Sequence, residues 1–239
     1  MYFAIPDDER LFVDKSREDR LVLTGLQVRL NPEQVIAGRA LIVRATEVEI
    51  DGHLKLPAGR VDIFARRIVA HPGATIDVSG ATGEPDYTGR APALPGTGPG
   101  ASGKAGNNGG DGGHGGSITL VAEAVDGSLR LWANGGAGGA AQSGGNGIKG
   151  ASGNAHVKCN PPTQGKPGGN AGPAGRPGRG GNGGQIAVTV LQPLADEQIQ
   201  CLVTAGKAGA PGNHGKAGAG GDGGRGGSEG KWIPEICVR

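Results

Sequence analysis

Large side chains are scarce in this sequence. Of its 239 residues only 3% are aromatic, and the chain has one methionine. Thick hydrophobic cores depend on such residues, so this composition excludes a conventional core and leaves the packing to alanine and short aliphatic side chains. The formal net charge is only +2, which gives no electrostatic reason to expect a nucleic-acid partner.

Cysteine is also rare, and its spacing forms no motif. Cys159, Cys201 and Cys237 contain no CxxC pair of the kind that binds metal, and three is an odd number for a disulfide framework. We expect ordinary small or free cysteines, whose disulfide state the sequence leaves open. Neither a metal ion nor a cofactor is predicted from them.

Long apolar runs are absent as well. No stretch approaches the length of a transmembrane helix, so no membrane span is expected. The opening sequence, Met-Tyr-Phe-Ala-Ile-Pro-Asp-Asp-Glu-Arg, lacks the layout of a secretory signal. The expected location is the cytoplasm, or the exterior after export by a non-classical route.

Glycine, by contrast, is abundant and periodic. The chain holds 51 glycines, and from Gly206 to Gly230 glycine occupies every third position without a break. Three residues per turn is the period of the polyproline II helix, whereas a flexible linker needs no register. Collagen requires long uninterrupted repeats in three chains, but these runs are short and lie between strand-like stretches. The pattern predicts extended segments that pair with one another as a polyglycine II bundle.

Strand-like alternation begins near the N-terminus. Leu21, Leu23, Leu26, Val28 and Leu30 are separated mostly by polar residues. Alternation of this kind is typical of a strand with one buried face, so these five residues are expected to face the core.

A longer repeat of roughly twenty residues follows. Residues 41–80 contain two copies of one order: strand, alanine, an aliphatic residue three positions on, turn, second strand. The order recurs over 117–132, more loosely over 186–203, and 232–238 looks like half of a further copy. Roughly twenty residues is the size of one coil of a β-solenoid. The predicted fold class is all-β with irregular segments: a short parallel β-solenoid with glycine-rich excursions.

The excursions interrupt the repeat at one corner. They cover 81–116, 133–185 and 204–231, and each leaves after the second strand of a coil and returns before the next coil. Because each is long enough to run out and back, six or more extended segments are expected in one layered slab. We expect residues 1–38 to form lead-in and capping strands, and residues 39–239 to form one intertwined domain.

Two parts of the sequence resemble known families. The coils at 41–80, 117–132 and 186–203 resemble the right-handed parallel β-helix of filamentous-haemagglutinin-type bacterial proteins. The stretch Gly109-Gly-Asp-Gly-Gly-His-Gly-Gly-Ser-Ile-Thr-Leu-Val-Ala-Glu123 is similar to the glycine-rich N-terminal domain of the Obg GTPases. That domain packs polyproline II segments, as do snow-flea antifreeze protein and certain phage tail-fibre adhesins. No GTPase domain follows here, so the resemblance implies an architecture of bacterial or phage type and no activity.

Three patterns resemble nucleotide-binding, calcium-binding or catalytic motifs, but each lacks a feature that such a site requires. Gly98-Pro-Gly-Ala-Ser-Gly-Lys104 nearly spells a phosphate-binding P-loop, but Ala105 stands where a Ser or Thr would hold Mg²⁺. Asp111 and Asp222 lie in Gly-Gly-Asp-Gly-Gly runs that lack the nine-residue period of calcium-binding repeats. The coil carboxylates alternate with core residues and are expected to face solvent: Glu47, Glu49, Asp62, Asp77 and Glu123. We therefore predict no nucleotide, metal or catalytic site.

The sequence favours a non-catalytic scaffold that displays a rigid glycine-rich slab for adhesion, assembly or recognition of a surface or polymer. The three excursions hold eleven Lys or Arg against five Asp or Glu, which points to a polyanion such as acidic polysaccharide. Missing stacking aromatics disfavour nucleic acid. The candidate partner-facing residues are Asp111, His114, Arg176, Arg179, Lys207, His214, Lys216, Asp222 and Arg225.

Two other functions stay open. A carbohydrate-active β-solenoid lyase or hydrolase would be indicated by acidic residues that meet in a cleft. An ice-binding protein is disfavoured because the threonines are few and form no regular row.

The C-terminal residues suggest a partner. Ile236-Cys-Val-Arg239 stops halfway through a coil. Solenoids cap their ends, and an uncapped strand edge is a template for pairing. We expect the chain to be a fragment, or its open edge to pair with another protein chain or with the remainder of a larger protein.

Overall fold

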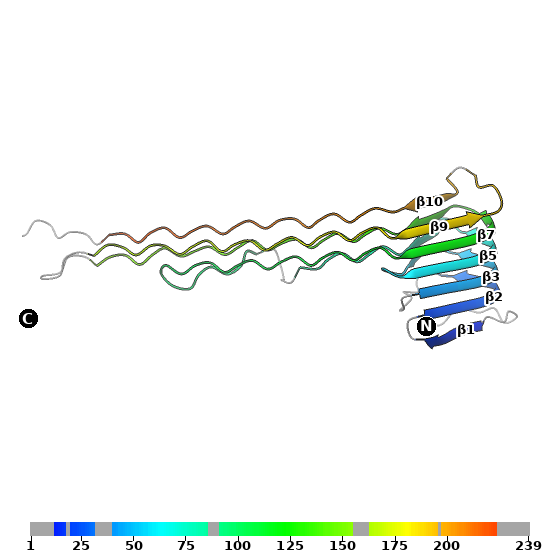
Figure 1. Ribbon diagram of the computed structural model, residues 1–239, viewed down its shortest axis with the longest axis horizontal. Helices are drawn as coiled ribbons and strands as arrows, with labels where there is room; N and C mark the ends of the chain where they lie inside the picture. The colour runs from blue at the N-terminus through cyan, green and yellow to red at the C-terminus, as the bar shows by residue number, and fades with distance from the viewer. Residues whose placement is uncertain are drawn as a thin grey trace, which may run out of the picture. The chain divides into compact units, whose positions relative to one another are not determined.

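The computed structural model describes residues 12–17, 20–31, 40–85, 91–154, 163–195 and 197–223, with side chains from Arg20 onward. Its strands are β1 (Phe12–Arg17), β2 (Arg20–Leu30), β3 (Ala40–Ile50), β4 (His53–Lys55), β5 (Arg60–Ala70), β6 (Thr75–Asp77), β7 (Ser117–Asp126), β8 (Leu129–Trp132), β9 (Gln185–Val190) and β10 (Ile199–Leu202). They form a six-stranded sheet in the order β1-β2-β3-β5-β7-β9 and a four-stranded sheet in the order β10-β8-β6-β4 (Figure 1). The described part of the chain is therefore all-β, and it contains no helix that could cross a bilayer.

Every strand pair except β1–β2 is parallel. From β3 to β10 successive strands alternate between the two sheets. The register places Leu41 beside Val61, and Ala45 beside Ala65, which in turn lies beside Ala122. The equivalence of the alanines that the sequence predicted is therefore confirmed.

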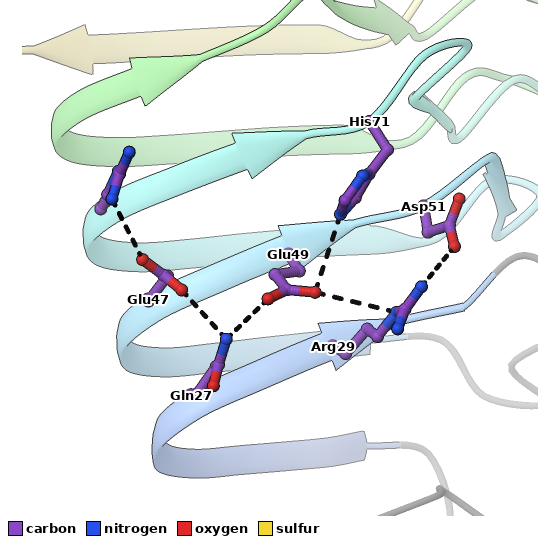
Figure 2. Close-up of polar contacts among 7 residues, drawn as sticks. Gln27, Arg29, Glu47, Glu49, Asp51 and His71 are labelled. Carbon is purple, nitrogen blue, oxygen red and sulfur yellow. Dashed lines mark hydrogen bonds and ion pairs between the residues drawn. The ribbon is translucent and has the colours of Figure 1, made fainter.

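Each long strand of the six-stranded sheet bends in its middle. In β3, Val43 and Ala45 pack on the core, Thr46 and Glu47 both leave it, and burial resumes at Val48. Figure 2 shows the ribbons of neighbouring strands turning a corner at this point. Alanine suits the position before the bend because a larger side chain would crowd the inside of the corner.

The bend makes one expectation wrong. Leu26, expected on the buried face, is 70% exposed. It occupies the first of the two outward positions at the bend of β2, so the alternation restarts one residue late. The other leucine and valine positions of this strand are buried as predicted: Leu21, Leu23, Val28 and Leu30.

The buried residues of both sheets form one hydrophobic cluster. Its described members are leucine, isoleucine, valine and alanine, without an aromatic side chain. Ile63 and Leu120 of the six-stranded sheet and Ile76 and Leu131 of the four-stranded sheet are completely buried. Burial of each such side chain stabilises the fold by about 1.5–3 kcal/mol, so this aliphatic cluster is the main source of stability for the sheets.

Five glycine-rich segments connect with the strands. Segment 1 (78–85 and 91–99) follows β6, segment 2 (100–116) leads into β7, segment 3 (133–154) follows β8, segment 4 (163–184) leads into β9 and segment 5 (203–223) follows β10. The chain forms two compact units. Unit 1 holds both sheets and residues 78–83, 111–116, 133–138, 179–184 and 203–208 of the segments, and unit 2 holds their other residues.

In unit 1 the segments bond to one another at three-residue intervals. Gly112 and Gly115 of segment 2 donate to the carbonyls of Arg179 and Asn182 of segment 4, at 2.8 and 2.9 Å. Segment 3 bonds to all four other segments. The bonds, donor first, are Gly80 to Asn134, Gly135 to Thr204, Gly136 to Gly113 and Gly181 to Gly136.

Unit 2 has the same pattern. Gly144 of segment 3 donates to Asn213 of segment 5, and Gly145 of segment 3 donates to Lys104 of segment 2, both at 2.8 Å. A Cβ added to Gly144 would lie 1.9 Å from the carbonyl oxygen of Gly172, far inside contact distance. Glycine at every third residue is therefore what lets the backbones approach closely enough to bond.

Segment 5 keeps this pairing with its neighbours to the end of its described residues. Gly221 donates to Lys166 at 2.8 Å, so the segment makes no turn within the described residues. The return expected before residue 231, the half coil at 232–238 and a sixth segment all lie outside the described part of the chain.

Candidate binding surfaces

A hollow of about 440 Å³ lies on the outer side of the strand bends. It is lined by Thr46, Glu47, Arg66, Arg67, Glu123, Ala124, Asp126 and Gln192. The bend explains this composition, because two consecutive residues of each strand leave the core there. Arg66-Arg67 of β5 and Glu123-Ala124 of β7 are such pairs.

The hollow contains three carboxylates, and each is paired with an arginine. Arg67 Nε lies 2.5 Å from Asp126 Oδ2, and Arg67 Nη1 lies 3.6 Å from Glu47 Oε2. Arg66 Nε lies 3.2 Å from Glu123 Oε2. The hydrogen bond to Asp126 raises the pKa of Arg67, which therefore stays a cation.

A polar ladder continues from the hollow across β2 and β3 (Figure 2). The amide of Gln27 donates to Glu47 at 3.0 Å and to Glu49 at 2.6 Å. Arg29 donates to Asp51 at 2.8 Å, and this hydrogen bond raises the arginine pKa. The ladder ties successive strands together by side chains as well as by backbone.

His71 completes the ladder from the end of β5. Its Nε2 is buried, has no hydrogen-bond partner among the described residues and lies 3.7 Å from Glu49 Oε2. Figure 2 shows the ring directed toward that carboxylate. At this distance the two groups attract each other only when the ring is protonated, so His71 is a weakly held member of the ladder.

Two coil carboxylates are buried, contrary to expectation. Asp62 is 2% exposed: its Oδ2 accepts from Arg60 Nε at 2.7 Å, while no described residue hydrogen-bonds to its Oδ1. Asp77 is 7% exposed, accepts from the Ser79 amide at 2.9 Å and lies 3.4 Å from His53 Nε2. Alternation placed both side chains outside the hydrophobic cluster correctly, but both are buried where exposure was expected.

The hollow itself was not predicted. The sequence indicated Glu47 and Glu123 as outward residues but not the arginines that meet them. The adjacent pair Arg66-Arg67 was the available signal, because two charged residues in succession break the alternation of a strand. Each carboxylate of the hollow is already paired with an arginine, so the hollow contains ion pairs and no unpaired acid among its lining residues.

In unit 1, two predicted partner-facing residues hold neighbouring segments together. Asp111 Oδ1 accepts from the Arg179 amide at 2.6 Å, and His114 Nδ1 accepts from the Asn182 amide at 2.9 Å. The side chains of Arg179 and Lys207 are exposed, and no ion pair to either is present among the described residues. Of the predicted partner-facing residues in unit 1, these two cations are therefore the ones whose side chains remain available.

Unit 2 divides its predicted residues in the same way. His214 Nδ1 accepts from the Ala174 amide at 3.3 Å, and Asp222 pairs with Lys149 at 2.7 Å. The backbone amides of Arg176 and Lys216 donate to the side-chain oxygens of Asn108 and Asn146. The side chains of Arg176 and Lys216 are exposed. Arg225 lies outside the described residues.

Other motifs have local structural roles. The P-loop-like run contains Gly98 and Gly100 at positive φ, of 113° and 75°, and no helix follows it in the described chain. Within the same described ranges no group of three His, Cys, Asp or Glu side chains is placed to hold a metal ion. No protein-family model, curated protein or solved structure matches this chain.

Proposed function

We propose that this protein is a non-catalytic scaffold, in which a short parallel β-solenoid supports a polyglycine II bundle that displays cationic side chains to a polyanionic polymer. Support for the solenoid comes from strands that alternate between two parallel sheets with a twenty-residue advance, as from Leu41 to Val61. Support for the bundle comes from hydrogen bonds repeated every third residue between segments.

The balance of charge in unit 2 carries the binding part of the proposal. Its described glycine-rich residues include five cations against two acids: Lys104, Lys149, Lys166, Arg176 and Lys216 against Glu84 and Asp222. Only Lys149 is paired within this set. A backbone already bonded on several sides loses little conformational entropy when its side chains engage a polymer, so weak contacts can add up.

The test is binding to a polyanionic polysaccharide, with polygalacturonate as the probe and neutral dextran as the reference. Replacing Lys104, Lys166 and Lys216 by glutamine removes three cations and is expected to weaken binding by about tenfold or more. The matched control replaces Lys55, Arg44 and Arg130, exposed cations of the sheets, by glutamine. Absence of binding, or equal weakening in both variants, would contradict the proposal.

A carbohydrate-active enzyme is the second candidate, because three acidic residues line one hollow. The arginine pairs oppose it, since each of these three carboxylates is already engaged by a cation. The experiment is chain cleavage of the same polysaccharides by the wild type and by Asp126→Asn. Cleavage that this substitution abolishes would establish the enzyme and remove the scaffold proposal.

A further inference from the structure

We propose that the β9–β10 end of unit 1 is a self-docking surface, on which a second copy of this chain pairs its own β9 with β9 across a two-fold axis. Among the described residues β9 pairs with β7 alone and β10 with β8 alone. No described strand pairs with the outer edge of either strand, and backbone groups on such an edge are a template for pairing. This inference goes beyond polymer binding and uses none of the cations invoked for it.

The core remains partly open at this end. Ile118, Leu120 and Ala122 of β7 are at most 2% exposed, but their neighbours in β9, Ile186, Val188 and Val190, are only partly buried. Cys201 of β10 is next to the fully buried Leu131, yet Cys201 is exposed. Leu202 and Val203 are 45% and 46% exposed. The last layer thus has the composition of a core, and no described part of the chain covers it.

Strands β9 and β10 themselves carry no charge, and the exposed Glu197 lies in the connection between them. Residues 185–195 and 198–206 contain no Lys, Arg, Asp or Glu, whereas β5 alone contains four such residues, Arg60, Asp62, Arg66 and Arg67. Edge strands of monomeric proteins commonly carry charges that prevent pairing. A neutral, partly apolar edge is what an interface requires, because no charge is desolvated when the edge is covered.

The neutrality also identifies the occupant. In a two-fold pair each copy presents the same strip, so the strip must be compatible with itself, and an uncharged strip meets this condition without repulsion. A head-to-tail contact would instead bring β9 against β1, which contains Asp14, Lys15 and Arg17. The surface therefore fits a closed dimer better than a filament.

Backbone geometry supports strand pairing at this edge. The amides of Gln185 and Leu191 donate to Gly116 and Ala122, at 3.0 and 3.1 Å. Because alternate residues of a parallel strand bond to the same neighbour, the amides between them are directed to the open side. An antiparallel β9 of a second copy would supply partners for them.

The test is sedimentation equilibrium of the full chain with a matched pair of variants. Thr189 of β9 and Thr24 of β2 are exposed threonines in one cross-strand row at opposite ends of the parallel strands. Thr189→Lys places two like charges near the two-fold axis and is expected to weaken dimerisation by about tenfold or more, while Thr24→Lys leaves it unchanged. A wild type that stays monomeric at about 100 μM, or equal effects of both variants, would overturn the proposal.

Cys201 provides a second readout in a Cys159→Ser, Cys237→Ser background. Its labelling by a maleimide should slow as protein concentration rises through the dimerisation range. Burial raises the pKa of the Cys201 thiol, so rates are compared at one pH. Dimerisation without protection of this thiol would place the interface elsewhere and refute the inference. Thr189→Lys should keep polygalacturonate binding, which separates failure of this proposal from failure of the polymer-binding one.

Discussion

At the residue scale, the glycine-rich segments follow a rule that is finer than glycine at every third position. Side chains of one segment accept the backbone amide of the equivalent residue in the next. Ser102 accepts from Asn170 at 3.2 Å, and Asn108 accepts from Arg176 at 2.7 Å. Ala105 lies midway between Ser102 and Asn108, and the same offset makes Pro173 its equivalent in the next segment. Ala105 has no side-chain acceptor, and Pro173 has no amide hydrogen to donate.

Gln142 adapts the same rule to an irregular site. In the three-residue series of segment 3 it takes the place of a glycine between Gly139 and Gly145. Its backbone amide donates to the Asn107 carbonyl at 3.0 Å. Its side chain accepts from the Asn107 amide at 3.0 Å and donates to the Ala91 carbonyl at 3.1 Å. The side chain of this glutamine thus forms hydrogen bonds that backbone groups form in a regular segment.

The need for glycine is testable with two alanine substitutions in unit 2. Gly144→Ala places a Cβ 1.9 Å from the Gly172 carbonyl oxygen, whereas a Cβ at Gly220 meets nothing within 4 Å. We expect Gly144→Ala to lower the free energy of unfolding by about 1–3 kcal/mol through overpacking. Gly220→Ala should change it by no more than about 0.5 kcal/mol. Calorimetric melting that does not distinguish the two variants would show that the segments are not closely packed.

At the element scale, the long strands are defined by their bends. Each has two alternating stretches joined by two consecutive outward residues, and these residues provide the wall of the hollow. The parallel register then repeats the arrangement from strand to strand, so arginines of β5 meet carboxylates of β3 and β7.

Two leucines of β2 test whether the bend shifts the alternation of buried and exposed positions. Leu23 is completely buried and Leu26 is 70% exposed. Leu23→Ala should destabilise the fold by about 2–5 kcal/mol, because it removes buried surface and leaves a cavity. Leu26→Ala should cost less than about 0.5 kcal/mol. Equal costs in chemical denaturation would mean that the alternation runs through the strand without a bend.

At the scale of the whole molecule, stability differs among the glycine-rich segments. Segment 3 bonds to segments 1, 2, 4 and 5, whereas the described residues of segment 5 bond to segments 3 and 4 only. Hydrogen exchange followed by mass spectrometry should therefore be slower in 133–154 than in 204–223, by about tenfold or more. Uniformly fast exchange in both would indicate unpaired, disordered segments.

Much of this architecture was predictable from the sequence because it is periodic. The twenty-residue repeat aligned Ala45 with Ala65, and the three-residue glycine register predicted that the segments pair with one another through their backbones. Alternation also separated core from outer positions, except at Leu26. These features follow from local geometry, which depends on neighbours along the chain.

The tertiary structure alone decided which side chains meet. Asp62 and Asp77 are buried, Arg67 pairs with Asp126 of the neighbouring strand, and Asp111 accepts the amide of a residue 68 positions along the chain. By itself the sequence determined the periods of the backbone, because those depend on φ and ψ preferences. Its charged and polar contacts depend on how the repeats are stacked, which only the folded chain specifies.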